Sequence, residues 1–485
     1  MKIAILTIGS EGDIRPYIAL GQELQQQQSR SSESGGNGGS NHEVYLVTHA
    51  NSKERIENAG LHFADIGKDP VTDLQESELG KAVNDASTFG KLSAVKIWFA
   101  SLVEDWFQKG KDALTSIQPD YVVLGTFPMN IHSMLLCSKD VLKIPSYCQI
   151  HLMPILPTTS HAPPVGFGDA RPSSLRCLTK LKWNLSMSVG FNMLYKVPLQ
   201  KCYAKYGGVS TISNEKVMKQ WRTTPAILGY SDILSPRPYD YNNETIKIVG
   251  PLMDNESEDS INSFLSTTKD GQTLTKYFDK VAAASSSTSG GDPKSKPTIF
   301  VGFGSMWDVF TDSEKQTLLT EIVGCAKLLE NETSGFIVQC DEATFEKVLE
   351  GGRVVVPDNN FITIQSAPHS WLFPKVDIVV CHGGSGTTHK AILHNCATIV
   401  CPCKPDDSDQ PFWAGCVARA GLGIHGPNAT TKSLRKSKLV KCIRQILNNP
   451  NIKTKVQTAS ELMKKQDGIK NGAKAILEFA SRNNV

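Results

Sequence analysis

Residues 377–393 read DIVVCHGGSGTTHKAIL, and the fold class can be inferred from this segment. A strand-like run, Asp377 to Val380, enters a turn of small residues, 381–388, and a helical pattern around Ala391 and Leu393 follows. This order is typical of open parallel α/β sheets, whose ligands bind where strand C-termini meet such turns. Small residues let the backbone approach an anion, and the free N–H groups of the helix start favour its charge. The stretch therefore predicts a phosphate site, although a tight connection alone can have a similar sequence.

The same unit recurs elsewhere in the chain. Gly9 to Pro16 (GSEGDIRP) follows the run Ile3–Ile8, and Gly302 to Ser305 follows Ile299–Val301. More short β-rich runs alternate with longer amphipathic segments in both halves, at Val44–Val47, Tyr121–Leu124, Phe336–Val338 and Ile399–Cys401. The alternation predicts an α/β protein built from two Rossmann-like, doubly wound parallel-sheet domains.

The length of 485 residues also favours two domains, because one hydrophobic core rarely organises so long a chain. Low-complexity stretches lie at about 25–41 and 282–296. We expect an N-terminal domain over 1–250 with an insertion at about 25–41, a linker and flexible insertion over 251–296, and a C-terminal domain over 297–485. The last helix is a candidate to pack back on the N-terminal domain.

Composition and charge exclude several function classes. Lys and Arg number 51 and Asp and Glu 48, and no long block of one sign stands out, so nucleic acid is not an expected partner. No stretch has the roughly 18 to 20 apolar residues of a spanning helix. Twelve cysteines without a secretory signal favour reduced thiols, and Cys401 and Cys403 are expected to be buried strand residues. We therefore expect a cytoplasmic protein, with peripheral membrane contact as a further possibility.

Residues 366–423 read SAPHSWLFPKVDIVVCHGGSGTTHKAILHNCATIVCPCKPDDSDQPFWAGCVARAGLG, which resembles the donor-binding segment of UDP-sugar-dependent glycosyltransferases with the GT-B architecture. APHSWLFPKV, HGGSGTTH and DQPFWA are most similar to the sterol 3-β-glucosyltransferase branch, and GSEGDIRP corresponds to its GSxGDxxP. Three positions depart from the family pattern: Asn395 stands where glycine is usual, Ser366 where plant relatives have tryptophan, and Glu11 where a basic residue is common.

The resemblance implies two Rossmann-like domains that face each other across a cleft, the N-terminal one binding the acceptor and the C-terminal one the UDP-sugar. It implies an inverting transfer of glucose from UDP-glucose to a hydroxyl of a lipophilic acceptor, a sterol or a phenolic compound, to give a β-glucoside. The diphosphate is assigned to His382 and the turn 384–387, uridine to the neighbourhood of Ala367 and His369, and sugar hydroxyls to Asp409 and Gln410. The implied donor-binding set is Gly12, Ser305, Ala367, His369, His382, Gly384, Ser385, Gly386, Thr387, Asp409 and Gln410.

Asp13 is the candidate catalytic base, because it is the one strong carboxylate candidate in the first half and coincides with the base of the resembling branch. The alternative is a helix cap, a common role of aspartate. His151, Met153 and Pro154 are candidate acceptor-binding residues, with His132 and His161 as further possibilities on the acceptor side.

Asp407, Ser408 and Asp409 form a D-x-D triplet, which binds manganese in the other glycosyltransferase fold. Its position beside Gln410, late in the second half, favours sugar binding instead. We therefore expect no metal and no cofactor, with UDP-glucose as a substrate and a helix end in place of a cation.

Arg171 to Lys201 mixes basic and apolar residues, and it is consistent with an amphipathic helix pair beside a lipophilic cleft, with peripheral membrane contact, or with a plain solvated helix. For the function, two transferases remain, one using UDP-glucose and one using UDP-N-acetylglucosamine on a lipid acceptor. A UDP-sugar epimerase of the same fold and a silent binding protein are the alternatives outside that class.

Overall fold

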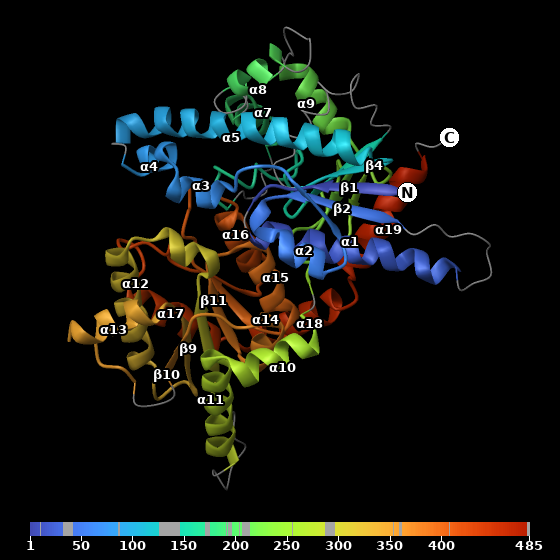
Figure 1. The fold of residues 1–485 in the computed structure, drawn as a ribbon. Coiled ribbons are helices and arrows are strands. Elements are labelled where there is room, and N and C mark those ends of the chain that lie inside the picture. Colours follow the sequence, from blue (N-terminus) through green and yellow to red (C-terminus); the bar gives the residue numbers. More distant parts are fainter. Residues whose placement is uncertain are drawn as a thin grey trace.

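The computed structural model describes residues 1–9, 11–32, 42–85, 88–125, 146–169, 175–190, 192, 196–202, 204–205, 214–254, 256–286, 296–352, 354–357, 361–406 and 408–482. Two sheets organise these residues, one above the other in Figure 1, and every pairing within them is parallel. The predicted fold class, two doubly wound α/β domains, is confirmed.

The first sheet has the strand order β3-β2-β1-β4-β5-β6-β7. Its strands are β1 (Lys2–Leu6), β2 (Glu43–Thr48), β3 (His62–Asp65), β4 (Tyr121–Leu124), β5 (Tyr147–His151), β6 (Ala226–Leu228) and β7 (Ile246–Ile248). Ile3 and Ile5 pack into the apolar cluster on one face, whereas Ala4 and Leu6 pack into the cluster on the other. Burial on both faces explains why this strand is a continuous apolar run.

Helices cover both faces of this sheet. They are α1 (Glu11–Ser32), α2 (Lys53–Asn58), α3 (Pro70–Glu76), α4 (Glu78–Asp85), α5 (Thr88–Ile117), α7 (Arg176–Gly190), α8 (Lys196–Cys202) and α9 (Asn214–Thr223). The longest, α5, runs across the N-terminal half below α7, α8 and α9 in Figure 1.

The second sheet has the order β10-β9-β8-β11-β12-β13. Its strands are β8 (Thr298–Gly302), β9 (Gly335–Gln339), β10 (Phe361–Ile364), β11 (Ile378–Cys381), β12 (Ala397–Val400) and β13 (Gly423–His425). The helices of this half are α12 (Asp312–Leu328), α13 (Glu342–Glu350), α14 (His369–Leu372), α15 (Ser385–Leu393), α16 (Gln410–Ala420), α17 (Lys436–Leu447) and α18 (Pro450–Met463). Asn395 follows α15 with φ of 65°, a left-handed conformation that asparagine tolerates and glycine prefers. The departure from the family's glycine therefore keeps the same turn.

The segment 251–296, expected as a linker with a flexible insertion, contains two helices, α10 (Glu258–Thr267) and α11 (Lys269–Ser286). Leu274 and Tyr277 of α11 are buried in the apolar cluster that also holds the C-terminal sheet. Much of the segment is thus part of the C-terminal half, because α11 has an apolar stripe that the neighbouring sheet buries.

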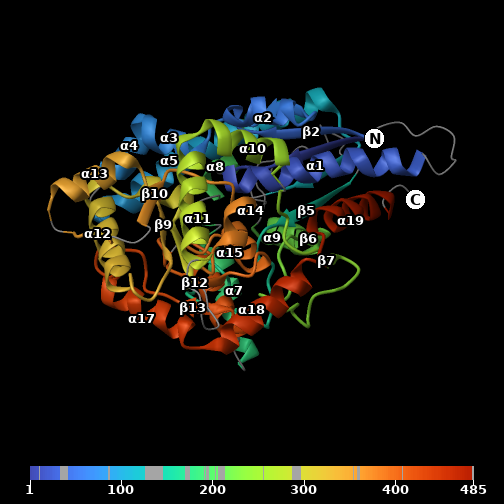
Figure 2. The same ribbon diagram turned by 90° about the horizontal axis from the view of Figure 1, so that it is seen from below.

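The last helix, α19 (Gly468–Arg482), lies against α1 of the N-terminal half, as Figures 1 and 2 both show. Ala473, Ile476 and Phe479 pack in the same cluster as Leu20 and Leu24 of α1. The chain therefore crosses between the halves twice, after β7 and again before α19. No helix among the described residues is both long and apolar enough to cross a bilayer.

Candidate active site

In both sheets the strand order reverses beside a glycine-rich turn. The N-terminal reversal lies between β1 and β4, where Gly9 follows β1, and the C-terminal one lies between β8 and β11, which lead into Gly302 to Ser305 and into His382. Ligands of open α/β sheets bind at such points, outside the carboxyl ends of the strands.

Three polar contacts join these edges across the domain interface. The Ser385 hydroxyl donates to the carbonyl of Leu152 at 3.0 Å, and the Ser231 N–H donates to Nε2 of His389 at 3.1 Å. Arg419 donates to the carbonyl of Asp169 at 3.2 Å. His389 also donates from Nδ1 to the Ser385 carbonyl at 2.7 Å, so it is neutral, and burial lowers its pKa to about 4. This histidine is a structural part of the interface.

Asp13 lies in the first turn of α1, two residues inside the helix, so it does not occupy the N-cap position. Its carboxylate covers Gly9, since a Cβ at Gly9 would lie 2.5 Å from Oδ2 of Asp13. Gly9 also has φ of 147°, which side chains rarely adopt. The turn after β1 therefore needs glycine in order to place the carboxylate at the sheet edge.

Asp409 approaches Asp13 from the C-terminal half. Its Oδ2 accepts the indole N–H of Trp413 at 2.7 Å. The pKa of Asp409 is raised to about 6, chiefly because burial disfavours the charged form and further because the negative charge of Asp13 is near. The charge of a carboxylate in the N-terminal half thus acts on one in the C-terminal half.

His382 follows β11, and its ring lies between two glycines. A Cβ at Gly384 would come within 2.5 Å of Nε2, and a Cβ at Gly304 within 3.5 Å of Cε1. Nδ1 is buried and has no hydrogen-bond partner among the described residues. Burial lowers the pKa of His382 to about 4, so the imidazole is neutral and has an unused nitrogen for a ligand.

The helix α15 begins directly after this histidine. Gly384 is its N-cap and makes no side-chain capping bond, so the N–H groups of the first turn, 385–387, have no side-chain cap. Gly383 has φ of 93°, and a Cβ there would lie 2.5 Å from Val400. The turn is therefore close-packed behind and presents a helix N-terminus in front, and Nε2 of His382 lies against the N-cap residue Gly384.

Four further residues are expected to contact the uridine or the phosphates of the donor. His369 begins α14 and stacks on Phe373 with ring centroids 4.3 Å apart. Burial, with the charges of Lys390 and Arg15, lowers the pKa of His369 to about 3. Ala367 is half-buried just before it, while Ser305 and Gly12 are exposed.

Gln410 uses its side-chain oxygen for contacts within the protein. Its side-chain oxygen accepts the N–H groups of Cys403, at 2.7 Å, and of Lys404, at 3.0 Å, and the residue is buried. The Gln410 oxygen thus holds the turn after β12. Of the two residues, Asp409 therefore has the side-chain oxygens that remain to accept a hydrogen bond from a ligand. Asp407, the first member of the D-x-D triplet, lies outside the described residues.

On the acceptor side, His151 is buried at the end of β5, with Nε2 3.0 Å from the side-chain oxygen of Gln149. Pro154 is buried too, and Met153 is half-buried against the larger core. His161 reaches the C-terminal half, where its ring packs 5.6 Å from that of Phe412. The segment 151–161 therefore lines the domain interface, but through His161 more than through His151; His132 lies outside the described residues.

Known proteins show the same organisation. Residues 3–105 match the glycosyltransferase family 28 N-terminal domain, and residues 309–472 match the glycosyltransferase family 28 C-terminal domain. The chain belongs to glycosyltransferase family 28. The resemblance seen in residues 366–423 is thereby confirmed.

A curated relative is the sterol 3-beta-glucosyltransferase of Saccharomyces cerevisiae (strain YJM789), which is 25% identical over 490 residues, 99% of this chain and 35% of that protein. The chain thus spans about a third of the length of this relative. Among solved structures, the glycotransferase of kitacinnamycin has a TM-score of 0.63 at 12% identity, covering 99% of this chain and 98% of the other. The glycosyltransferase VinC in complex with dTDP has a TM-score of 0.57 at 14% identity, covering 99% and 100%. These likenesses confirm the GT-B fold.

Sequence reasoning missed an ion-pair network that joins three segments of this family 28 chain. Arg15 of α1 lies 3.8 Å from Asp254 and 3.9 Å from Glu256, and Lys390 of α15 lies 3.0 Å from Asp254. Burial raises the pKa of Asp254, but the two cations more than offset this, so the pKa ends below its usual value. The only available signal was the charge of Arg15 beside Asp13, because its partners are more than 200 residues away.

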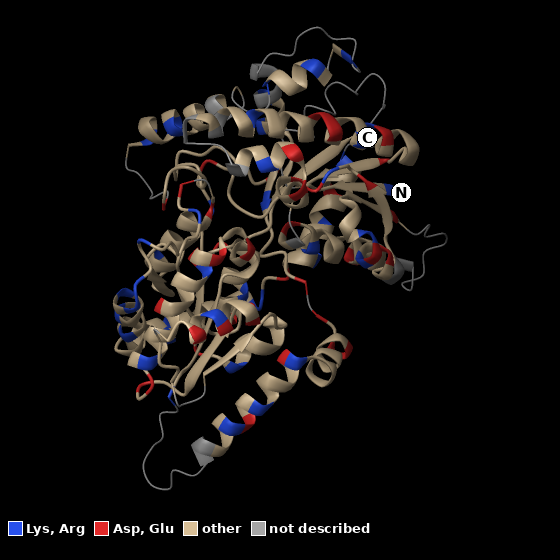
Figure 3. Cartoon of the chain, turned by 60° about the vertical axis from the view of Figure 1, so that its left-hand side comes forward, with Lys and Arg blue, Asp and Glu red and all other residues tan. Residues whose placement is uncertain are grey.

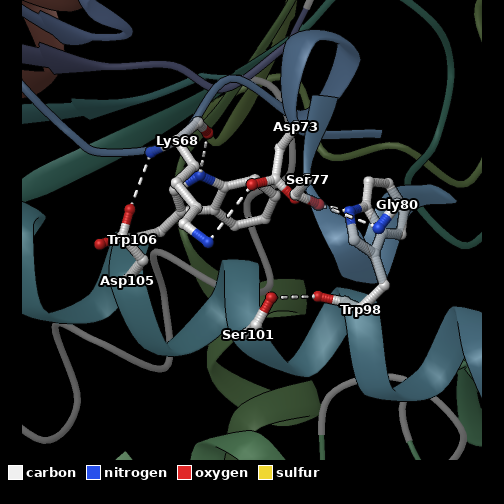
Figure 4. Close-up of polar contacts among 8 residues, drawn as sticks. All are labelled: Lys68, Asp73, Ser77, Gly80, Trp98, Ser101, Asp105 and Trp106. Atoms are coloured by element: carbon white, nitrogen blue, oxygen red, sulfur yellow. Dashed lines mark hydrogen bonds and ion pairs between the residues drawn. The ribbon is translucent and has the colours of Figure 1, made fainter. Parts of the chain in front are cut away.

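His49 was missed as well. Its Nε2 accepts the N–H of Gly9 at 3.4 Å, and its Nδ1 donates to the carbonyl of Gly67 at 3.0 Å. Figure 4 shows how the neighbouring Lys68 is held, with its N–H on Asp105 at 2.8 Å and its carbonyl on the Trp106 indole at 2.8 Å. The turn under Asp13 therefore rests on α5 through His49.

Within the described residues, no group of three or more His, Cys, Asp or Glu side chains is arranged to hold a metal ion. The eleven cysteines of those residues are all free thiols.

Replacing Gly384 by alanine tests the contact between the turn and His382. The backbone of Gly384 has φ of −62°, so alanine adds no backbone strain, and only the 2.5 Å approach to the imidazole is unfavourable. We expect Gly384→Ala to lower the free energy of unfolding by about 1 to 3 kcal/mol, as overpacking does. Gly386→Ala is the matched control, because a Cβ there meets nothing within 4 Å. Thermal unfolding should show the control unchanged or slightly more stable, and equal loss in both variants would contradict the crowding.

Proposed function

We propose that the chain is an inverting glucosyltransferase, which moves glucose from UDP-glucose to a hydroxyl of a sterol or a similar lipophile and gives a β-glucoside. The observation that carries this proposal is the pair of carboxylates, Asp13 and Asp409, which come from opposite domains and lie near enough for the charge of Asp13 to raise the pKa of Asp409. The name of the yeast relative supports the sterol acceptor, and the dTDP complex of VinC supports a nucleoside diphosphate donor.

In this mechanism each group has one task. The diphosphate lies at the N–H groups of the first turn of α15, and His382 donates to it as a neutral imidazole. Asp409 accepts hydrogen bonds from sugar hydroxyls, which selects donors that can supply them. Uridine lies near Ala367 and His369, and Ser305 is a further phosphate contact.

Asp13 takes the proton of the acceptor hydroxyl as that oxygen attacks C1 of glucose. The bond between C1 and the phosphate oxygen breaks, and its electron pair leaves with UDP, whose charge the helix end stabilises. Attack from the side opposite to UDP inverts the anomeric centre, so α-linked glucose becomes a β-glucoside. The acceptor enters from the segment 151–161 of the N-terminal half.

The decisive experiment is incubation with radiolabelled UDP-glucose and a panel of sterol and phenolic acceptors. The proposal expects labelled β-glucoside. Label that remains in an epimerised nucleotide sugar would instead identify the UDP-sugar epimerase, and transfer only from UDP-N-acetylglucosamine would identify the other transferase.

Asp13→Asn should lower kcat by at least about 10², because the amide cannot accept the proton. The melting temperature should move little, since asparagine is similar in size and can accept the same hydrogen bonds. Paired measurements of kcat and thermal unfolding separate catalysis from stability. A near-normal kcat would remove Asp13 from the mechanism.

The pH dependence of donor binding reports on Asp409. Below its pKa of about 6 the carboxyl is protonated and accepts hydrogen bonds poorly, so the affinity for UDP-glucose should fall between pH 7 and 5. UDP alone lacks the sugar and is the control ligand, and its affinity should fall less. In Asp13→Asn the step should move to lower pH, because a repelling charge is gone. Calorimetry on both ligands measures this, and identical pH profiles would contradict the sugar contact.

The raised pKa of Asp409 also makes the free energy of unfolding depend on pH. The folded-state pKa of Asp409 lies above its ordinary value of 3.8, so the folded state binds this proton more tightly than the unfolded chain. The contribution of Asp409 to the free energy of unfolding should therefore fall as the pH rises from 3.8 to about 6. Asp409→Asn should remove this pH-dependent contribution.

Chelation tests whether glucosyl transfer requires a metal ion. A helix N-terminus in place of a cation predicts that glucosyl transfer survives excess EDTA. Loss of turnover with EDTA and its recovery with manganese would favour the D-x-D alternative.

A further inference from the structure

The helix α7 has an unusual distribution of apolar side chains. Thr179, Trp183 and Met187, spaced four apart, are buried and attach it to the protein. Leu178, Leu181 and Leu185 are exposed, with 46%, 61% and 56% of their surface accessible. At about 100° per residue these three leucines lie on the face opposite to the buried stripe. Leu175, just before the helix, is 55% exposed and extends the apolar surface.

The sequence that contains this helix has charges of one sign. Residues 170–214 contain seven Lys or Arg and no Asp or Glu, although the whole chain has 51 and 48. Figure 3 shows both signs mixed over most of the molecule, so this segment is an exception. Within α7, Arg176, Lys180 and Lys182 are exposed. Arg222 of α9 adds a further cation through its hydrogen bond to Asn184 at 3.3 Å.

We propose that this face of α7, defined by Leu178, Leu181 and Leu185 with Lys180 and Lys182, docks on an anionic lipid bilayer. Exposed leucines opposite a buried stripe are unfavourable in water but insert readily at the level of the headgroups, and the cations beside them attract anionic phospholipids. A protein partner of mixed charge would require acidic residues on this face as well, and the segment has none.

The position of α7 relates the docking face to the acceptor. The indole of Trp183, on the inner side of the helix, donates to the carbonyl of His161 at 2.8 Å. His161 belongs to the segment through which the proposed acceptor enters, and it packs on Phe412 of the C-terminal half. A lipophilic acceptor leaving the bilayer under α7 would therefore meet that segment directly. This link rests on the proposed function, whereas the docking itself does not.

The test is sedimentation of the full chain with vesicles of phosphatidylcholine, with and without phosphatidylserine, at low and high salt. We expect binding to the anionic vesicles that weakens with salt. The triple variant Leu178→Ser, Leu181→Ser, Leu185→Ser should bind at least about tenfold more weakly. The matched control is Leu328→Ser, Leu349→Ser, Leu462→Ser, which removes three exposed leucines from helices of the C-terminal half and should bind normally.

Charge reversal by Lys180→Glu and Lys182→Glu should abolish the preference for phosphatidylserine and leave thermal unfolding unchanged. Asp13→Asn should bind vesicles as the parent chain does, so that a failure of the glucosyltransferase proposal stays distinct from a failure of docking. The proposal is overturned if the parent chain ignores anionic vesicles or if the leucine triple variant binds them equally. It is also overturned if sedimentation velocity shows that the leucines hold two copies of the chain together instead.

Discussion

Asp13 in the N-terminal half and Asp409 in the C-terminal half carry like charges that act on each other across the domain boundary. Burial and mutual repulsion both disfavour the charged form, and the raised pKa of Asp409 reports that cost. Three hydrogen bonds across the interface help to offset this cost. They join Ser385 with Leu152, Ser231 with His389, and Arg419 with Asp169. The packing of α19 on α1 adds apolar area to the same task. The site therefore exists only while the two halves stay docked.

Asp13 and His382 each depend on a glycine turn that is supported from behind. Gly9 lacks a Cβ that would clash with the carboxylate of Asp13. His49 joins Gly9 to Gly67, and the neighbouring Lys68 bonds to Asp105 of α5. Under His382, Gly383 and Gly384 bring the backbone against Val400 and the imidazole. Such preorganised turns place N–H groups and charges without the entropy cost of ordering a loop at the moment of reaction.

The proposed reaction and the proposed docking surface place different demands on the N-terminal half. The reaction needs a dry interface near Asp13, and docking needs an outer face with exposed leucines and cations. The helix α7 serves both, because its Trp183 contacts the interface segment at His161 while its leucines point away. A lipophilic acceptor could thus pass from a bilayer to the base with little exposure to water.

The two parallel sheets, the glycine turns and a helix after the turn 381–388 could be predicted from the sequence alone, because these follow from local periodicity and backbone stereochemistry. Its resemblance to the glycosyltransferases also named Asp13, His382 and Asp409 as candidates. Three other roles could be seen only in the folded chain: Gln410 holds its own turn, His151 is buried on Gln149, and Arg15, Asp254 and Lys390 form one network. The role of each of these side chains depends on its hydrogen-bond or ion-pair partners and on how far it is buried from water. Both depend on residues far apart in the chain that meet only after folding.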